Sequence, residues 1–173
     1  MSRACSAALP IAWIVLRILI VLNWLMGAAI LVLLIAMPNA QWIMSAFKLS
    51  PSADTDQLIL ALRVIASIGV IIIPLNYLIL RQLLAMVGTV RVGDPFVPAN
   101  AHRLRVIAWT LLVLQLLGIV IGCIAKAVST PAHPLHLDAG FSTSGWLAVL
   151  LTFILASVFA EGTLMREDLE GTV

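Results

Sequence analysis

Charge is the scarcest property of this sequence. Asp, Glu, Lys and Arg make up 10% of its 173 residues, and 62% are hydrophobic, whereas soluble domains carry about 25% charged residues. The charges also avoid four apolar stretches, 18–47, 58–80, 106–125 and 139–160, where Arg63 is the only exception. A helix rises about 1.5 Å per residue, so about 20 apolar residues cross a hydrocarbon core of about 30 Å. The composition therefore excludes a soluble globular domain and predicts membrane helices.

Several kinds of chemistry lack the residues that they require. Glu161 is the only carboxylate on a predicted span, and it lies at the end of that span, so intramembrane aspartyl catalysis and proton-coupled transport have no candidate groups. No histidine lies within the apolar stretches, which excludes a haem held between spans. GxSxG and P-loop motifs are absent, and no run of Lys or Arg suits direct binding to nucleic acid. We therefore expect a non-enzymatic protein with no catalytic residue and no cofactor.

The few cysteines and histidines do not form a recognisable site. Cys5 lies near the N-terminus and Cys123 inside the third stretch, so a disulfide between them is not geometrically sensible. His133 and His136, followed by Asp138, could hold a metal in a loop, but no HExxH or CxxC spacing accompanies them. We interpret this loop as an ordinary solvated connector and predict no metal site.

The predicted fold is an all-α integral membrane protein, a bundle of four transmembrane helices in a single domain over 1–173. The remaining loops are too short to bury a core of their own, and Pro74 predicts a bend in the second helix. The spans are expected at about 14–37, 58–80, 104–127 and 145–164, followed by a short C-terminal tail.

The distribution of basic residues predicts the orientation. Cytoplasmic loops are enriched in Lys and Arg, and a cytoplasmic N-terminus places seven of the 10 Lys and Arg residues inside. Trp13 and Trp109 then lie near the inner interface, where amphipathic rings settle. We therefore expect both termini and the tail in the cytoplasm. The inner basic residues are Arg3, Arg17, Arg81, Arg91, Arg103, Arg105 and Arg166.

Polar residues inside the spans have two interpretations each. Arg63 can extend its side chain to the headgroups, which we favour, or pair with an acidic residue of the outer loops. Gly118 and Gly122 form a GxxxG pattern that permits close packing, within the bundle or in a homo-oligomer. The other polar side chains are more typical of hydrogen bonds between helices than of a transport path. The acidic candidates are Asp54, Asp56 and Asp138, and the polar residues are Asn23, Ser67, Asn76, Gln115, Thr152 and Ser157.

Two segments on the predicted cytoplasmic side carry the most distinctive sequence. In the loop that follows the second span, Gly93-Asp94-Pro95 predicts a turn, and Pro98 suits the first position of a helix that continues into the third span. In the tail, apolar residues recur every four positions from Met165 and predict a short stripe beside acidic residues. A segment of this kind can dock on another surface.

These segments resemble a family of small bacterial membrane proteins of unknown function with four spans. Val97 stands where the family pattern would have a capping Thr or Ser, which implies a weaker helix cap. Such proteins are often encoded beside a helix-turn-helix regulator of the Cro/CI type, so the resemblance implies a bacterial inner-membrane protein with a cytoplasmic transcription regulator as partner. It implies no catalytic residue. The similar positions are Pro95-Phe96, Asn100-Ala101, Arg103-Leu104-Arg105, Ile107, Trp109, Glu161-Gly162, Leu164, Arg166 and 168–173.

We therefore expect a regulatory or signalling membrane protein that acts through a cytoplasmic partner. The basic loop 91–105 and the acidic tail 164–173 are expected to pack together as its functional face. At least one arginine at the depth of Glu161, either Arg17, Arg81 or Arg105, is expected to contact Glu161 or the tail that follows it. A tail that simply continues the fourth helix is the competing arrangement, and arginines that only set topology and contact anionic lipid are the competing role. The alternative function is a carrier of a small molecule or lipid, or an immunity-type membrane protein. The residues expected to bind the partner are Arg91, Asp94, Phe96, Arg103, Arg105, Glu161, Arg166 and Asp168.

Overall fold

The described part of the chain is entirely helical. A computed structural model describes residues 3–36, 53–93, 95–129 and 140–170, and side chains within 9–36, 56–93, 95–129 and 140–166. No strand occurs in these ranges. The helices are α1 (Arg3–Ala36), α3 (Ala53–Val92), α4 (Pro98–Val128) and α5 (Thr143–Glu170).

All four helices are long and apolar enough to cross a membrane. The shortest, α5, has 28 residues, which is about 42 Å at 1.5 Å per residue and exceeds a hydrocarbon core of about 30 Å. The structure therefore confirms the predicted all-α architecture with four helices that are able to span a membrane.

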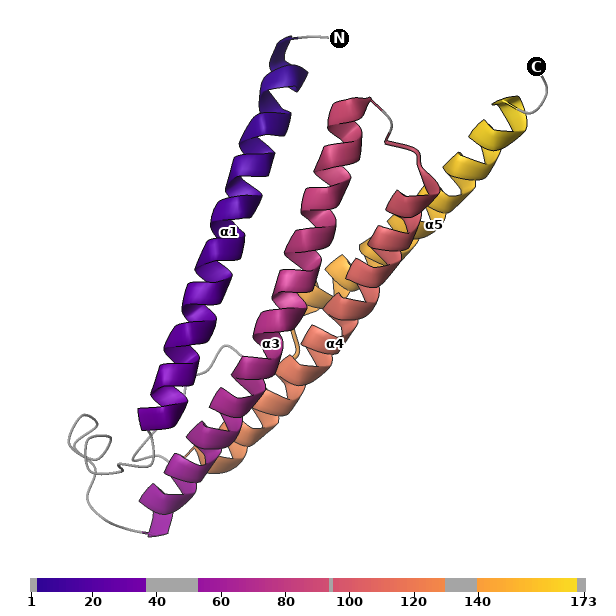
Figure 1. Cartoon of the computed structure of the whole chain (residues 1–173). Helices are drawn as coiled ribbons and strands as arrows, with labels where there is room; N and C mark the ends of the chain where they lie inside the picture. The colour runs from indigo at the N-terminus through magenta and orange to yellow at the C-terminus, as the bar shows by residue number, and fades with distance from the viewer. Residues whose placement is uncertain (1–2, 37–52, 94, 130–139, 171–173) are drawn as a thin grey trace.

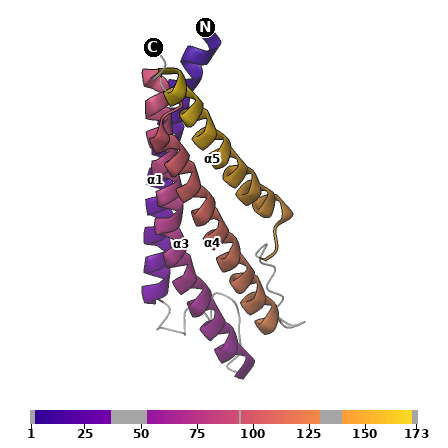
Figure 2. The same cartoon turned by 90° about the vertical axis from the view of Figure 1, so that its right-hand side faces the viewer.

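The helices pack side by side in chain order. Extensive contacts join α1 to α3, α3 to α4, and α4 to α5, so α3 and α4 each have two packed neighbours while α1 and α5 each have one. Figure 1 shows α1 flanking α3 on the side away from α4, and in Figure 2 α5 lies alongside α4. The bundle is therefore open. The start of α1, the turn between α3 and α4, and the end of α5 lie at the same end of the molecule (Figure 1), which we call the arginine end because Arg17, Arg81, Arg91, Arg103 and Arg105 lie toward it.

Many large apolar side chains are exposed on the surface of the bundle, and small ones are buried between helices, as expected for a protein surrounded by lipid. Large apolar side chains of α1 such as Leu25 and Ile35 are 61% and 69% exposed, which is favourable where the surroundings are acyl chains. The buried positions on α4 and α5 are rich in alanine, and small side chains let membrane helices approach closely. These alanines are Ala101, Ala108, Ala125 and Ala156.

The helices extend beyond the predicted spans. The second helix begins at Ala53 and continues through Pro74 to Val92, well past the predicted end at 80. Likewise α5 runs to Glu170, so the predicted tail up to that residue continues the helix, as in the competing arrangement. In α3, Arg81 and Gln82 interrupt the apolar stretch, but 83–87 is again apolar and the helix continues. At the end of α5, polar turns remain hydrogen-bonded helix beyond the apolar part.

The GxxxG residues lie at contacts within the chain. Gly122 is buried, and a Cβ placed on Gly118 would lie 3.9 Å from the backbone carbonyl oxygen of Gly140, just before α5. Close by, Gln115 Nε2 donates to the Ser142 carbonyl at 3.2 Å, and the backbone N–H of Gly145 donates to Ser142 Oγ at 3.2 Å. This side of α4 therefore holds the beginning of α5.

Candidate functional site

The turn at the arginine end is built around one glycine and one proline. Gly93 has a φ of +93°, a conformation that glycine adopts without a Cβ penalty, and its N–H donates to the Val90 carbonyl at 3.1 Å. The chain then passes through Asp94, which lies outside the described residues, to Pro98 at the first turn of α4. Val97, at the N-cap position, is extended and makes no side-chain cap hydrogen bond, as the missing Thr or Ser implied.

Asn100, in the first turn of α4, forms a buried polar network. Its side chain is 0% exposed, and its Nδ2 donates to Thr89 Oγ1 and to the Pro95 carbonyl, both at 2.8 Å. Its Oδ1 accepts a 2.8 Å hydrogen bond from Arg103. A single amide therefore ties the end of α3, the turn and the first turns of α4 together, with its polar atoms satisfied as burial requires.

Arg103 therefore points inward. Its guanidinium also lies 3.5 Å from the Ala85 carbonyl of α3, and the residue is half-buried. Arg103 and Arg105 are both among the residues expected from the sequence to bind the partner. Only Arg105 is exposed, so the two arginines of this short motif have different structural roles.

Phe96 connects the turn to α5. Its ring stacks on Phe159 with centroids 5.3 Å apart and planes inclined by 29°. A Cβ on Gly162 would lie 3.3 Å from the Phe96 ring, so glycine at this position permits the close approach. Phe96 therefore contacts α5 at Phe159 and Gly162. The packing of the loop 91–105 against the tail 164–173 stays a prediction, because the side chains beyond Arg166 lie outside the description.

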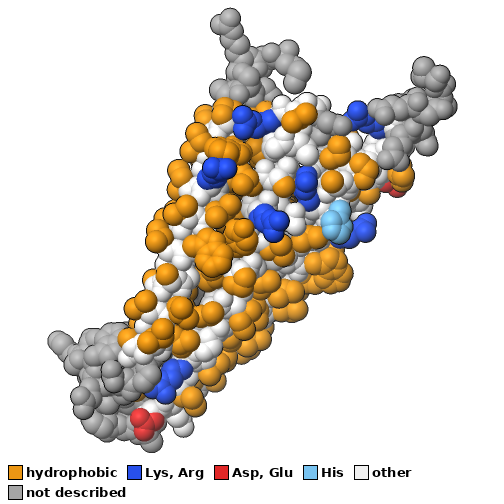
Figure 3. Space-filling model, in the orientation of Figure 1, with side chains coloured by type: hydrophobic (Ala, Val, Ile, Leu, Met, Phe, Trp, Pro, Cys, Tyr) orange, Lys and Arg blue, Asp and Glu red, His pale blue; other side chains and the backbone are white. Residues whose placement is uncertain are grey.

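Basic side chains also surround Trp13 on α1. The Arg17 guanidinium lies 3.9 Å from the centre of the Trp13 ring, and that of Arg91, from α3, lies 6.0 Å away. Both distances fall within the range of cation–π attraction. Figure 3 shows Lys and Arg side chains gathered toward this end of the visible face, above a broad apolar surface.

The remaining predicted partner residues lie at the surface. Arg91, Arg105, Glu161 and Arg166 are exposed. Among the described residues no ion pair joins Glu161 to an arginine. The other predicted contact, between one of these arginines and the tail, stays a prediction, because the tail side chains beyond Arg166 lie outside the description. The side chain of Asp168 lies outside the description, and so do the histidines of the loop 130–139. Arg63 is half-buried, and the side chains of Asp54 and Asp138, two of its candidate acidic partners, also lie outside the description.

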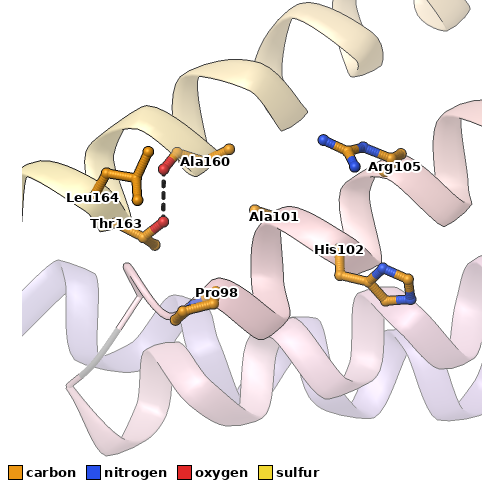
Figure 4. Close-up of a pocket in the computed structure, with 7 residues that line it drawn as sticks. All are labelled: Pro98, Ala101, His102, Arg105, Ala160, Thr163 and Leu164. Carbon is orange, nitrogen blue, oxygen red and sulfur yellow. Dashed lines mark hydrogen bonds between the residues drawn. The ribbon is translucent and has the colours of Figure 1, made fainter. Parts of the chain in front are cut away.

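A hollow of about 330 Å³ opens between α4 and α5 beside the turn. Figure 4 shows the Arg105 guanidinium pointing toward the space between the two helices, whereas the His102 ring points away from α5. Thr163, which is buried, donates its hydroxyl to the Ala160 carbonyl at 2.7 Å on the opposite wall. The hollow is lined by Pro98, Ala101, His102, Arg105, Ala160, Thr163 and Leu164.

A second hollow lies between α1 and α3 and is apolar. Its volume is about 440 Å³, and beside it Asn23 Nδ2 donates to the Ile73 carbonyl at 3.1 Å. This hydrogen bond supports the interpretation of Asn23 as a link between helices rather than part of a polar path. The lining residues are Trp24, Gly27, Ala28, Leu31, Val70, Ile73 and Pro74.

Sequence reasoning missed the residues that organise this end of the molecule. In the sequence, Asn100 stands out only as part of the family-like pattern, and no motif marks Thr89 or Thr163. An asparagine two residues after a helix-starting proline was the available signal, because such a polar side chain must find partners when it is buried.

The comparisons with known proteins concern α3, α4 and α5. A family model described as a protein of unknown function, DUF2975, matches residues 56–173, and α1 lies outside this range. No curated protein and no solved structure matches the chain. Because the family model covers more than half of the sequence, including the turn and both walls of the hollow beside it, the chain belongs to the DUF2975 family of proteins of unknown function.

Proposed function

We propose that this protein is a non-enzymatic membrane protein that docks a cytoplasmic regulator at its arginine end. The observation that carries the proposal is the contact of Phe96 with Phe159 and Gly162, because it joins the two most distinctive segments of the sequence into one surface. The partner implied by the family resemblance is a small helix-turn-helix transcription regulator. In this proposal the arginine end faces the cytoplasm of a bacterium.

The exposed groups around that contact are suited to a protein partner. Leu164 and Met165 are 60% and 62% exposed at the end of α5, and Arg105 and Arg166 are exposed beside them. Apolar side chains next to charged groups at one end of a membrane protein provide both contact area and electrostatic selection of a partner. Arg103 is occupied by Asn100 and is therefore assigned a structural role instead.

Site-specific photo-crosslinking in intact cells tests this function. A photoreactive phenylalanine analogue replaces Met165 at the arginine end or, as the matched control, Lys126 at the far end of α4; both residues are exposed. We expect a covalent adduct with a helix-turn-helix regulator from position 165 only, together with altered expression of the genes that it controls when Arg166 is changed to Glu. Equal adducts from both positions, or lipid adducts alone from position 165, would reject the proposal.

A carrier of an apolar ligand is the second candidate, favoured by the hollow between α1 and α3. Its wall contains Ala28, and Ala28→Trp would fill the space. Leu25→Trp is the control, because Leu25 is 61% exposed on α1 but does not line the hollow. Loss of a co-purifying apolar molecule from the first variant alone, measured by mass spectrometry of extracts, would support this function over docking.

A further inference from the structure

The hollow between α4 and α5 contains the guanidinium group of Arg105, and most of its other lining side chains are small or apolar. Arg105 points toward it (Figure 4), and no carboxylate is among its lining residues. Within the described part of the chain, Arg105 makes no hydrogen bond or ion pair. Its guanidinium donors are therefore available to an anion, and planar guanidinium groups suit phosphate oxygens.

The depth of Arg105 in the membrane favours a particular anion. The helix α4 has 31 residues, a length of about 46 Å, so it exceeds a hydrocarbon core of about 30 Å by about 8 Å at each end when it is centred. Arg105 lies about 10 Å along the helix from Pro98. This position is close to the boundary between hydrocarbon and headgroups, where the phosphates of phospholipids lie.

Trp109 provides an apolar wall one helical turn deeper. Residues four apart share a helix face, so Trp109 lies on the same side of α4 as Arg105. It is 57% exposed and its ring meets Phe153 of α5 edge-on, with centroids 5.4 Å apart. Arg105 followed by an exposed indole therefore matches an amphiphile that has an anionic head and an apolar chain.

We propose that this hollow binds an anionic phospholipid, with its headgroup phosphate at Arg105, His102 at the rim, and an acyl chain against Trp109. The side chains of Ala101, Ala160 and Leu164 give the hollow an apolar surface that an amphiphile can cover, whereas a free hydrated anion would use only its polar groups, Arg105, His102 and Thr163. The proposal does not depend on a protein partner, and docking at Met165 can fail without affecting it.

Native mass spectrometry of the full-length protein in detergent tests the site. Phosphatidylglycerol and phosphatidylcholine with the same acyl chains are titrated separately, and the affinity of the first bound lipid is measured for the natural protein and for Arg105→Gln. We expect preference for phosphatidylglycerol and a loss of about tenfold in its affinity in the variant, as for the loss of a charge-assisted hydrogen bond. Arg105→Lys should keep part of the affinity, because it retains the charge but not the planar donor pair.

Arg81→Gln is the matched control, because Arg81 is an exposed arginine on α3 that does not line the hollow. It should leave the affinity unchanged, and circular dichroism should show the same helix content for all variants. Equal losses in Arg81→Gln and Arg105→Gln, or equal binding of the two lipids, would overturn the proposal in favour of diffuse attraction. Displacement of the lipid by millimolar inorganic phosphate would overturn the lipid assignment and indicate a site for a free anion.

Discussion

At the scale of single residues, Asn100 illustrates what a buried amide can do in a membrane protein. It is the largest fully buried side chain among the described residues, and it accepts from Arg103 while donating to Thr89 and Pro95. Such a network mainly fixes the turn relative to α3 and α4 and adds little to the stability of the fold, because hydrogen bonds between membrane helices contribute only about 0.6 kcal/mol each. Removing the amide is costlier, because the Pro95 carbonyl loses its donor and the Arg103 guanidinium loses its 2.8 Å acceptor.

Replacing Asn100 by Ala should therefore destabilise the protein by about 2 kcal/mol, since buried polar groups left unpaired cost about 1 to 3 kcal/mol. Unfolding in detergent with increasing sodium dodecyl sulfate, followed by circular dichroism, measures the effect. Ser157→Ala is the control, because the Ser157 hydroxyl is exposed and bonds only to the Phe153 carbonyl of its own helix. A loss no larger than that of the control would show that the network does not hold the turn.

Phe96 makes the second prediction at this scale. Phe96→Ala removes the stacking on Phe159, and aromatic pairs contribute about 0.5 to 1.5 kcal/mol beyond their burial. We expect a loss of about 2 kcal/mol in the same unfolding assay. Leu164→Ala, which truncates a 60% exposed apolar residue nearby, should change stability by less than about 0.5 kcal/mol. Equal effects of the two variants would mean that Phe96 does not hold α5 to the turn.

At the scale of helices, the spacing between α1 and α3 depends on glycine. A Cβ on Gly27 would lie 2.9 Å from Ile73 Cγ2, and the β-branched Ile73 is stiff about its first side-chain torsion. Across the same interface, a Cβ on Gly69 would lie 3.7 Å from the Ile30 side chain, an ordinary contact distance. The two glycines therefore provide opposite tests of one interface.

Gly27→Ala should push the two helices apart and destabilise the protein by about 1 to 3 kcal/mol, the usual effect of overpacking. Gly69→Ala should be neutral or slightly stabilising, because Ala is the better helix former and has room. Thermal unfolding in detergent compares the two variants. The same destabilisation in both would show that packing at Gly27 is not what sets this interface.

The extents of the helices show how far hydropathy can predict this structure. The apolar stretches correctly located all four helices, because only about 20 apolar residues are needed to cross the hydrocarbon core. They did not predict that α3 reaches Val92, because Arg81 and Gln82 interrupt the apolar stretch although 83–87 is again apolar. They did not predict that α5 reaches Glu170 either, since charged residues at a helix end carry no hydropathy signal. The Asn100 network depends on distances between three chain segments, which spacing along one segment does not encode.

At the scale of the whole molecule, the packing order of the helices was also beyond the sequence pattern. In a soluble protein an apolar stripe marks the buried face of a helix, but lipid-exposed faces are equally apolar, so α1 shows no such distinction. Its Leu25 and Val32 are 61% and 66% exposed, although residues of these types would be expected in the core of a soluble protein. What the sequence does encode at this scale is charge: apart from Arg63, the arginines lie toward the end that holds the start of α1, the turn and the end of α5.

That asymmetry leads to the prediction of orientation, with the arginine end in the cytoplasm. In a background lacking Cys5 and Cys123, single cysteines replace Val92, which is 87% exposed beside the turn, or Ser129, which is exposed at the opposite end of α4. A membrane-impermeant maleimide applied to intact spheroplasts should label position 129 and spare position 92 until the cells are lysed. Labelling of position 92 alone would reverse the orientation and would also place Met165 and Arg166 out of reach of any cytoplasmic regulator.

Because positive charges near the ends of spans set topology, the additional replacement of Arg81, Arg91 and Arg105 by Gln should increase the fraction of inverted molecules. The same two cysteines measure that fraction.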